Sequence, residues 1–319
     1  MQKYKVIFMG TPVFATAVLT ALTKLAPTIE LIGIVTQPDR KIGRNQTVQF
    51  SPVKEFGLAH QIQIFQPEKI NDLYSELEAL QPDVIVTCAY GQFIPERILK
   101  LAKINCINAH GSLLPKLRGG APIHKAIIYG EQETGITLMK MIKKMDAGEM
   151  YVQEALTIAA DETASSLHDR LMILAGTMIE KHLLDIITGK LLGTPQDDSQ
   201  ATFAYNITRD EEKISWHLPK QNIYDQIRGL YAWPIAYTTV ANVIYKIHQA
   251  VIATEPLAEK DADLVDGTII AVLKTGIKVK VEDGYLIITR LQREGKKVTE
   301  AKNYYHTPSP EIIPGNILI

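Results

Sequence analysis

The sequence is short of cysteine, the residue that builds disulfides, redox dithiols and many zinc sites. It holds only two cysteines in 319 residues, Cys88 and Cys106, and both lie in apolar runs. Neither belongs to a Cys-x-x-Cys pair, so we expect neither a zinc cluster nor a redox dithiol, and no metal. Buried, reduced thiols are typical of a cytoplasmic protein, which is the location that we expect.

Charge of one sign and long apolar runs are also scarce. The chain has 34 Lys and Arg against 35 Asp and Glu, so no overall field attracts a nucleic acid, and such a partner would need a local basic patch. No apolar run approaches the roughly 20 residues of a membrane-spanning helix, so we expect no membrane association. The opening stretch MQKYKVIFMGTPVF is interrupted by Gly10 and Pro12, which favours a strand and turn over a targeting peptide.

The first half of the chain alternates short apolar runs with segments of helical spacing. Continuous apolar runs are typical of parallel strands that are covered on both faces. The expected strands lie at 5–10, 30–37, 81–90 and 105–108. The expected helices lie at 12–24, 71–80 and 119–130. This order predicts an α/β fold with a doubly wound, mostly parallel Rossmann-like sheet, which binds ligands at the carboxyl ends of its strands.

The pattern changes after residue 135. Two expected strands, 135–142 and 149–158, are joined by the segment KKMDAG, and a long amphipathic helix follows at 161–189. Beyond residue 207, short strands broken by turns predict a small all-β, OB-like barrel domain. The expected organisation is an α/β domain at 1–190, a linker at 191–206 and a C-terminal barrel at 207–319.

The stretch INCINAHGSLLPKLRGGAP, residues 104–122, places an amide and an imidazole at the end of a buried strand. Residues two positions apart point to the same side of a strand, so Asn108 and His110 project together. Both side chains can donate hydrogen bonds, and two convergent donors form a workable oxyanion hole. Asp146, in the segment KKMDAG, is a candidate to orient the imidazole. Ala147 and Gly148 would allow close approach to a ligand.

The spacing alone leaves another interpretation open. A His and an Asn at the end of a strand often only form structural hydrogen bonds with neighbouring protein groups. An Asp between two strands is often only a turn residue, and the sequence does not reveal whether Asp146 contacts His110.

The stretch NAHGSLLPKLRGGAPIHKAIIYGEQETGITLMKM, with MDAGEM after it, closely resembles the folate-dependent formyltransferase superfamily. The signature of that family is Asn-x-His-x-Ser-Leu-Leu-Pro, then Arg-Gly and Ala-Pro, then an Asp in an Asp-x-Gly loop. The resemblance implies that Asn108 and His110 stabilise the oxyanion on the formyl carbon. It implies that Asp146 pairs with His110 and assists proton movement. The implied co-substrate is 10-formyltetrahydrofolate, with no metal.

The same resemblance implies that Ser112, Leu113, Leu114 and Pro115 form the wall of the folate pocket. An alternative interpretation is that Leu113 and Leu114 are core residues. The peptide bond between Leu114 and Pro115 is a candidate for a cis junction, which the sequence does not decide.

Three features resemble the branch of this superfamily whose acceptor is initiator methionyl-tRNA. FMGTPVFA at 8–15 resembles its first strand and lacks the dinucleotide pattern G-x-G-x-x-G. TQPDRKIGRNQTVQFSPVK at 36–54 resembles its inserted, tRNA-reaching loop. The third feature is a barrel with ITRDEEKISW, AWP and a terminal PGNIL. The implied enzyme makes N-formylmethionyl-tRNA for translation initiation, with the barrel assisting tRNA binding. We expect it to be a monomer, although nothing in the sequence fixes the oligomeric state.

The cations expected to contact tRNA are Arg40, Lys41 and Arg44. Lysines that usually follow the Gly-Arg of this loop are replaced here by polar residues, so we expect weaker loop electrostatics or compensation elsewhere. The alternative is a solvated loop without a contact role. A basic cluster at 290–297 could bind an RNA backbone, but an ordinary solvated surface is an equally good interpretation.

Other functions share parts of this pattern. An amino-sugar-nucleotide formyltransferase has the same Asn, His and Asp and a small barrel, but a small sugar does not need the loop at 37–50. A formyltetrahydrofolate hydrolase module uses water in place of the amine. A non-enzymatic RNA-binding protein would leave the Asn-His-Asp set unexplained, and a nicotinamide dehydrogenase would need the missing glycine pattern.

Overall fold

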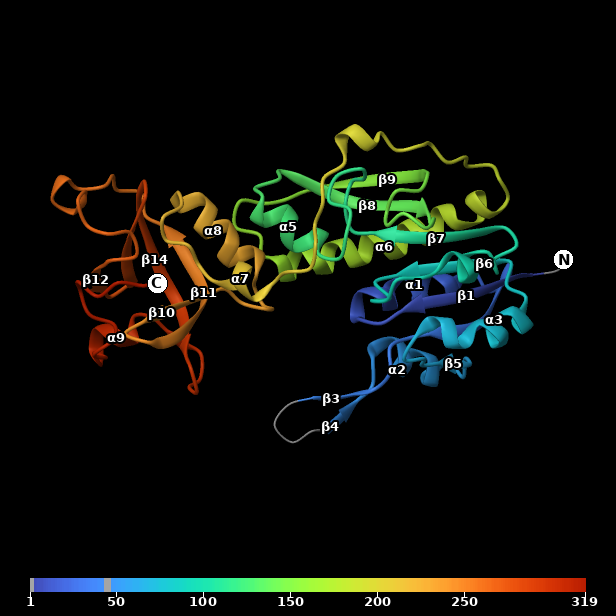
Figure 1. Cartoon of the computed structure of the whole chain (residues 1–319), viewed down its shortest axis with the longest axis horizontal. Coiled ribbons are helices and arrows are strands. Elements are labelled where there is room, and N and C mark those ends of the chain that lie inside the picture. Colours follow the sequence, from blue (N-terminus) through green and yellow to red (C-terminus); the bar gives the residue numbers. More distant parts are fainter. Residues whose placement is uncertain (1–2, 43–46) are drawn as a thin grey trace. The chain divides into compact units, whose positions relative to one another are not determined.

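The computed structural model describes residues 3–42 and 47–319 (Figure 1). The chain divides into two compact units, and each combines separate stretches of the sequence. The first unit contains Met1–Pro122, Glu133–Thr157 and His168–Tyr205. The second contains Ile123–Gln132, Ile158–Leu167 and Asn206–Ile319.

The first unit is built on a seven-stranded sheet with the order β5-β2-β1-β6-β7-β8-β9. Neighbouring strands from β5 to β7 are parallel, whereas β8 and β9 run antiparallel. The mostly parallel α/β sheet predicted from the sequence is therefore confirmed. The strands are β1 (Tyr4–Gly10), β2 (Ile29–Val35), β5 (Ile64–Phe65), β6 (Val84–Cys88), β7 (Asn105–His110), β8 (Glu133–Lys140) and β9 (Met150–Thr157).

Helices cover this sheet, and the long predicted helix forms α6. Gly176 lies where α6 meets α1, and a Cβ atom added there would be 2.9 Å from the carbonyl oxygen of Ala17. Glycine therefore permits the close approach of these two helices. The helices formed largely by this unit are α1 (Val13–Lys24), α2 (Pro52–Ala59), η1 (Ile70–Leu73), α3 (Tyr74–Leu80), α4 (Glu96–Leu99) and α6 (Ala164–Ile187), with η2 (Asp198–Gln200) in the connector.

The segment after β2 forms an antiparallel hairpin of β3 (Arg40–Ile42) and β4 (Thr47–Gln49). Its base is fixed by Asp39, whose carboxylate accepts hydrogen bonds from Lys54 at 2.5 Å and Gln66 at 2.8 Å. These two hydrogen bonds lower the pKa of the Asp39 carboxyl. The sequence predicted only a loop here, because the segment shows no alternation of apolar residues.

The second unit contains an antiparallel sheet with the order β10-β11-β14-β13-β12, and β15 pairs with β14. Residues 315–319 hydrogen-bond to both edges of this sheet, through Thr239 on β10 and Ile269 on β12, and so close it into a barrel. The predicted all-β domain is confirmed. The strands are β10 (Tyr237–Val240), β11 (Val243–Ile252), β12 (Ile269–Leu273), β13 (Gly276–Val281), β14 (Gly284–Arg293) and β15 (Thr299–Glu300). The helical segments of this unit include α5 (Pro122–Ile128), α7 (Arg209–Glu212), α8 (Lys220–Gly229), η3 (Glu259–Asp261) and α9 (Asn303–His306).

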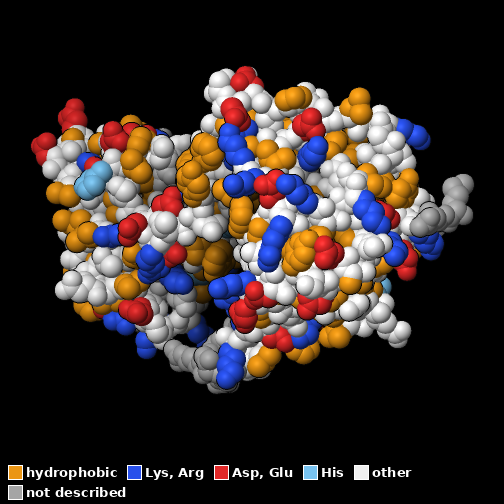
Figure 2. Space-filling model, turned by 45° about the vertical axis from the view of Figure 1, so that its right-hand side comes forward, with side chains coloured by type: hydrophobic (Ala, Val, Ile, Leu, Met, Phe, Trp, Pro, Cys, Tyr) orange, Lys and Arg blue, Asp and Glu red, His pale blue; other side chains and the backbone are white. Residues whose placement is uncertain are grey.

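The surface of the protein mixes charges of both signs. Figure 2 shows Lys and Arg side chains interspersed with Asp and Glu side chains over the visible face. This distribution agrees with the formal net charge of −1. Among the described residues, no helix combines the length and the apolar character needed to cross a membrane.

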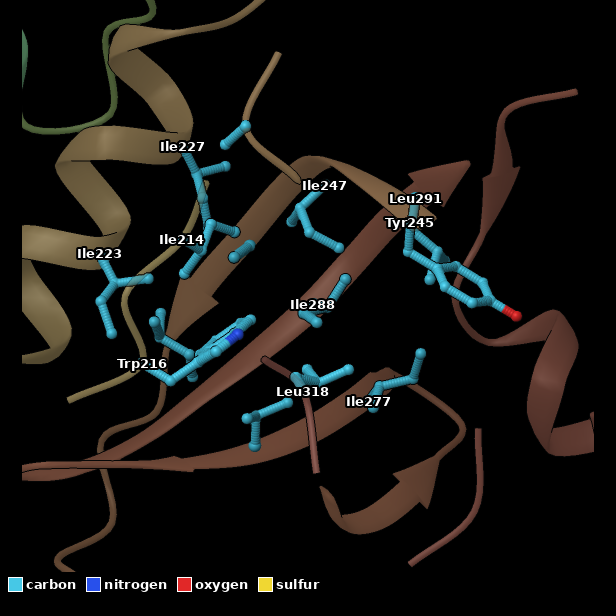
Figure 3. Packing of buried hydrophobic residues seen from close by; sticks show 14 of the residues in the cluster. Ile214, Trp216, Ile223, Ile227, Tyr245, Ile247, Ile277, Ile288, Leu291 and Leu318 are labelled. Atoms are coloured by element: carbon cyan, nitrogen blue, oxygen red, sulfur yellow. The ribbon is translucent and has the colours of Figure 1, made fainter. Parts of the chain in front are cut away.

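The interior of the barrel is a continuous apolar cluster (Figure 3). Trp216 is buried in it, and its indole nitrogen donates to the hydroxyl of Thr238 at 2.9 Å. Ile223 and Ile227 of α8 belong to the same cluster, so the helix packs against the barrel core. A buried indole with a satisfied N–H stabilises such a core without a polar penalty.

Candidate active site

Asn108 and His110 lie at the carboxyl end of β7 and point to the same side of the sheet. In the sheet register, Asn108 is opposite Thr87 of β6, and His110 is opposite Thr137 of β8. The His110 side chain is buried, whereas Asn108 is half-buried. The fold therefore places both groups at the edge where an α/β sheet binds ligands.

Thr87 fixes the orientation of the Asn108 side chain. Its hydroxyl donates to Oδ1 of Asn108 at 2.9 Å. The carbonyl end of the amide is thereby occupied, and the NH₂ group is the end that remains to donate to a ligand. Thr87 carries one signal in the sequence, because it is the one hydroxyl residue in the otherwise apolar strand Val84–Cys88.

Both ring nitrogens of His110 face protein groups. Nε2 lies 3.0 Å from the carbonyl oxygen of Leu117. A carbonyl only accepts, so Nε2 carries the proton in this hydrogen bond. In the neutral ring, Nδ1 is then unprotonated and carries a lone pair. This atom lies 3.7 Å from Oδ2 of Asp146. The ring is thus oriented to accept a proton on Nδ1 beside a carboxylate.

Asp146 lies in the loop between β8 and β9. Its backbone has a φ of +50°, a left-handed conformation that Asp tolerates better than most residues. Oδ2 accepts a hydrogen bond from the Gly119 amide at 2.9 Å. The two ends of the loop approach closely at Gly148, where an added Cβ would be 1.9 Å from the carbonyl oxygen of Lys140. The structure thus brings Asp146 together with His110, which the sequence did not reveal.

The four residues expected to line a folate pocket divide into two groups. Ser112 and Leu114 are buried, whereas Leu113 and Pro115 are half-exposed. The hydroxyl of Thr137 donates to the Ser112 carbonyl at 2.6 Å and accepts from the Leu114 amide at 3.1 Å. The peptide bond between Leu114 and Pro115 is cis. The buried pair is therefore held inside the loop, whereas Leu113 and Pro115 are partly exposed.

The cations expected to contact tRNA lie on the hairpin. Arg40 and Lys41 are exposed on β3, and Arg44 lies outside the described residues. In the barrel, the cluster at 290–297 is partly neutralised, because Arg293 forms an ion pair with Glu311 at 2.8 Å.

The arrangement suits a reaction in which a carbonyl carbon becomes tetrahedral. The Asn108 amide can donate to the developing oxyanion, and His110 can take up a proton beside Asp146. The cysteines take no part in this chemistry, because burial raises the pKa of the Cys88 thiol to about 12 and also raises the pKa of the Cys106 thiol. Among the described residues, no group of three or more His, Cys, Asp or Glu side chains is placed to hold a metal.

Two family models match the chain. The model described as "Formyl transferase" matches residues 3–182, and the model described as "Formyl transferase, C-terminal domain" matches residues 206–308. Together they cover both parts of the chain that the sequence analysis distinguished.

Curated proteins match over nearly the whole length. The chain is 44% identical over 304 residues to a methionyl-tRNA formyltransferase of Mycoplasma mycoides, covering 95% of each chain. It is 44% identical over 318 residues to a methionyl-tRNA formyltransferase of Staphylococcus aureus, covering 99% of each chain.

Solved structures share the fold at low identity. The chain is 20% identical to the sugar 3N-formyl transferase WlaRD, solved with dTDP and 5-N-formyl-THF, with a TM-score of 0.65 over 93% of this chain and 100% of that one. It is 14% identical to HypX from Aquifex aeolicus, solved with tetrahydrofolic acid, with a TM-score of 0.63 over 95% of this chain and 47% of that one.

Proposed function

Because the chain belongs to the formyl transferase family, among its methionyl-tRNA formyltransferases, we propose that it formylates initiator methionyl-tRNA. The proposed formyl donor is 10-formyltetrahydrofolate. The observation that carries the proposal is the 44% identity to methionyl-tRNA formyltransferases over 95% or more of the chain. The product is N-formylmethionyl-tRNA, which is used to initiate translation. This role places the protein in the cytoplasm.

The first step joins the amine to the formyl carbon. The α-amino nitrogen attacks that carbon, a C–N bond forms, and the electron pair of the C=O bond moves to oxygen. The NH₂ group of Asn108, held by Thr87, donates to this oxyanion. A donor of this kind contributes about 2.7–4 kcal/mol to lowering the barrier.

The second step moves a proton and releases the folate. Nδ1 of His110 accepts the proton that the attacking nitrogen loses, and the resulting imidazolium lies beside Asp146. The Leu117 carbonyl keeps Nε2 in place during this step. His110 then gives the proton to N10 of the folate as the bond between N10 and the formyl carbon breaks. The oxyanion collapses to a carbonyl, and the products are the formylated amine and tetrahydrofolate.

The folate lies against the loop that follows β7. Leu113 and Pro115, the half-exposed members of that loop, contact the ring system of the folate. Ser112 and Leu114 hold the loop from inside and assist binding through its backbone. No metal enters the proposed mechanism.

The tRNA contacts are assigned to both parts of the chain. Residues 1–190 form the catalytic domain, 191–206 the linker, and 207–319 a barrel domain that assists tRNA binding. Arg40, Lys41 and Arg44 contact the acceptor end of the tRNA, and the enzyme acts as a monomer.

The decisive experiment compares three acceptors with 10-formyltetrahydrofolate as donor. The purified protein is incubated with charged initiator tRNA, with an amino-sugar nucleotide, or with water alone, and the formylated product and tetrahydrofolate are quantified. We expect rapid transfer to the tRNA and at least about 100-fold slower reaction with the other two. Transfer to the sugar alone would contradict the proposed acceptor, and release of formate without transfer would identify a hydrolase.

A further inference from the structure

Arg118 is the largest fully buried side chain among the described residues, with 1% of its surface exposed. A buried guanidinium is costly unless its donors are satisfied. Nε and Nη2 donate to Oε1 of Gln196 at 3.0 and 2.7 Å, and Nη2 also lies 2.7 Å from Oδ1 of Asp198. Lys144 completes this group by pairing with Oδ2 of Asp198 at 2.5 Å. Hydrogen bonds from Lys144 and Arg118 lower the pKa of the Asp198 carboxyl, so the ion pairs persist at neutral pH.

The two hydrogen bonds from Arg118 set the orientation of the Gln196 amide. Because Oε1 faces the guanidinium, the NH₂ group must face the opposite way. Nε2 donates to the carbonyl oxygens of Asp146 and Gly148, both at 2.8 Å. One side chain therefore binds the backbone of the Asp146 loop at two points, including the residue in the left-handed conformation.

The connector that carries Gln196 also binds the loop after β7. The Arg118 amide donates to the Thr202 carbonyl at 2.9 Å, and the Ala204 amide donates to the Arg118 carbonyl at 2.7 Å. The Leu117 amide donates to the Thr202 hydroxyl at 2.9 Å. This is the loop whose Leu117 carbonyl holds His110 and whose Gly119 amide holds Asp146. The connector thus fastens both loops that orient the candidate catalytic pair.

We propose that Gln196, held by Arg118, is a positioning residue that sets the placement of Asp146 beside His110, an inference that rests on the proposed function. Arg118 and the Asp146 and Gly148 carbonyls occupy both ends of the Gln196 amide, so it acts through Asp146. Its Oε1 accepts hydrogen bonds from Arg118, and its NH₂ group donates to the backbone of the Asp146 loop. The position of Arg118 therefore determines where the Asp146 loop lies. A displacement of about 1 Å in such a group reduces the rate by up to about 100-fold.

The test uses the full-length protein and two substitutions at one position. Gln196→Met keeps the length of the side chain and removes both the acceptor and the donors. Gln196→Glu keeps an acceptor for Arg118 and places an oxygen, which cannot donate, against the Asp146 and Gly148 carbonyls. Gln200→Met is the matched control, because the Gln200 amide donates to Asp197 within the connector itself at 3.0 Å.

We expect kcat for formyl transfer to fall 10- to 100-fold in both Gln196 variants, with KM for each substrate changed less than about threefold. Gln200→Met keeps the wild-type kcat. On an Asp146→Asn background, Gln196→Met should lower the residual kcat by less than about twofold, because its effect passes through Asp146.

A wild-type kcat in Gln196→Glu would overturn the proposal, as would the full effect of Gln196→Met on the Asp146→Asn background. A fall in kcat that only parallels loss of folded protein, followed by circular dichroism, would also overturn it. Failure of the wild-type protein itself to formylate the tRNA would instead contradict the proposed function, so the two failures are distinguishable.

Discussion

Nδ1 of His110 lies 3.7 Å from Oδ2 of Asp146, and that same oxygen accepts the Gly119 amide at 2.9 Å. The carboxylate is therefore positioned by the backbone, close to the ring but beyond hydrogen-bond distance from it. Apo active sites often show such long contacts, which tighten in the substrate complex. A proton arriving on Nδ1 would convert this contact into a charge-assisted hydrogen bond, which is about twice as strong as a neutral one.

Substitutions at Asn108 and Thr87 test the oxyanion donor. Asn108→Ala should lower kcat about 100- to 1,000-fold, because it removes one oxyanion donor. Thr87→Val should lower kcat about tenfold. It removes the hydrogen bond that orients the Asn108 amide, and the loss of one such bond corresponds to about a tenfold change. Steady-state kinetics with both substrates measures these effects.

Thr134→Val provides the control for the Thr87 substitution. Thr134 is buried in β8, and within the described part of the chain its hydroxyl has no hydrogen-bond partner. Its replacement should leave kcat unchanged. Equal losses in Thr87→Val and Thr134→Val would show that the Thr87 hydroxyl has no specific role.

Lys41→Ala tests whether the hairpin contacts tRNA. Lys41 is exposed on β3, so its loss should not affect folding. We expect a higher KM for tRNA, an unchanged KM for folate, and a slope of log KM against log salt that is smaller by about one. Lys190→Ala, at another exposed lysine, is the control. Identical salt dependence in wild type and Lys41→Ala would remove this residue from the interface.

The two cysteines should be unreactive in the folded protein. Burial raises the pKa of the Cys88 thiol to about 12, so almost no thiolate is present at pH 8. We expect a thiol reagent to leave the activity intact and to modify both cysteines only in denaturant. Fast modification of the folded enzyme with loss of formyl transfer would contradict this prediction.

Glu311 should make stability depend on acidic pH. The Ser309 hydroxyl and the Arg293 guanidinium lower the pKa of its carboxyl from 4.5 to about 2. A lowered pKa in the folded state stabilises the protein above the unfolded value and loses that contribution as pH falls from about 4.5 to about 2. Glu311→Gln should therefore lower the free energy of unfolding by about 1–2 kcal/mol at pH 7, measured by denaturant unfolding.

The difference in the free energy of unfolding between wild type and Glu311→Gln should become smaller as the pH approaches 2. Glu294→Gln, at an exposed glutamate, is the control and should behave like wild type. A cost at pH 7 that stays constant down to pH 2 would contradict the assigned ionisation.

Local patterns were sufficient to predict the central strands and the longest helix. The run in Val84–Cys88 is buried at every position, so its continuous apolar character identifies a covered strand. The hairpin of β3 and β4 carries no such signal, because its described side chains are exposed and its strands have three residues each. The base of the hairpin depends on the anchoring of Asp39 by Lys54, which no periodicity reveals.

The candidate site was only partly predictable. The spacing of Asn108 and His110 fixes their common direction, because strand geometry is local. Their partners are set by contacts between distant segments, such as the hydrogen bonds from Gln196 to residues 48 and 50 positions away. A polar, aperiodic connector gives no sign that it binds the active-site loops.

The final prediction concerns the rate of formyl transfer to initiator methionyl-tRNA by His110→Ala and Asp146→Ala at saturating substrate concentrations. We expect kcat to fall at least about 1,000-fold in each variant, because proton transfer and its electrostatic support are lost. Circular dichroism should show that both variants remain folded. A kcat within tenfold of wild type in either variant would contradict the claim that this pair carries the reaction.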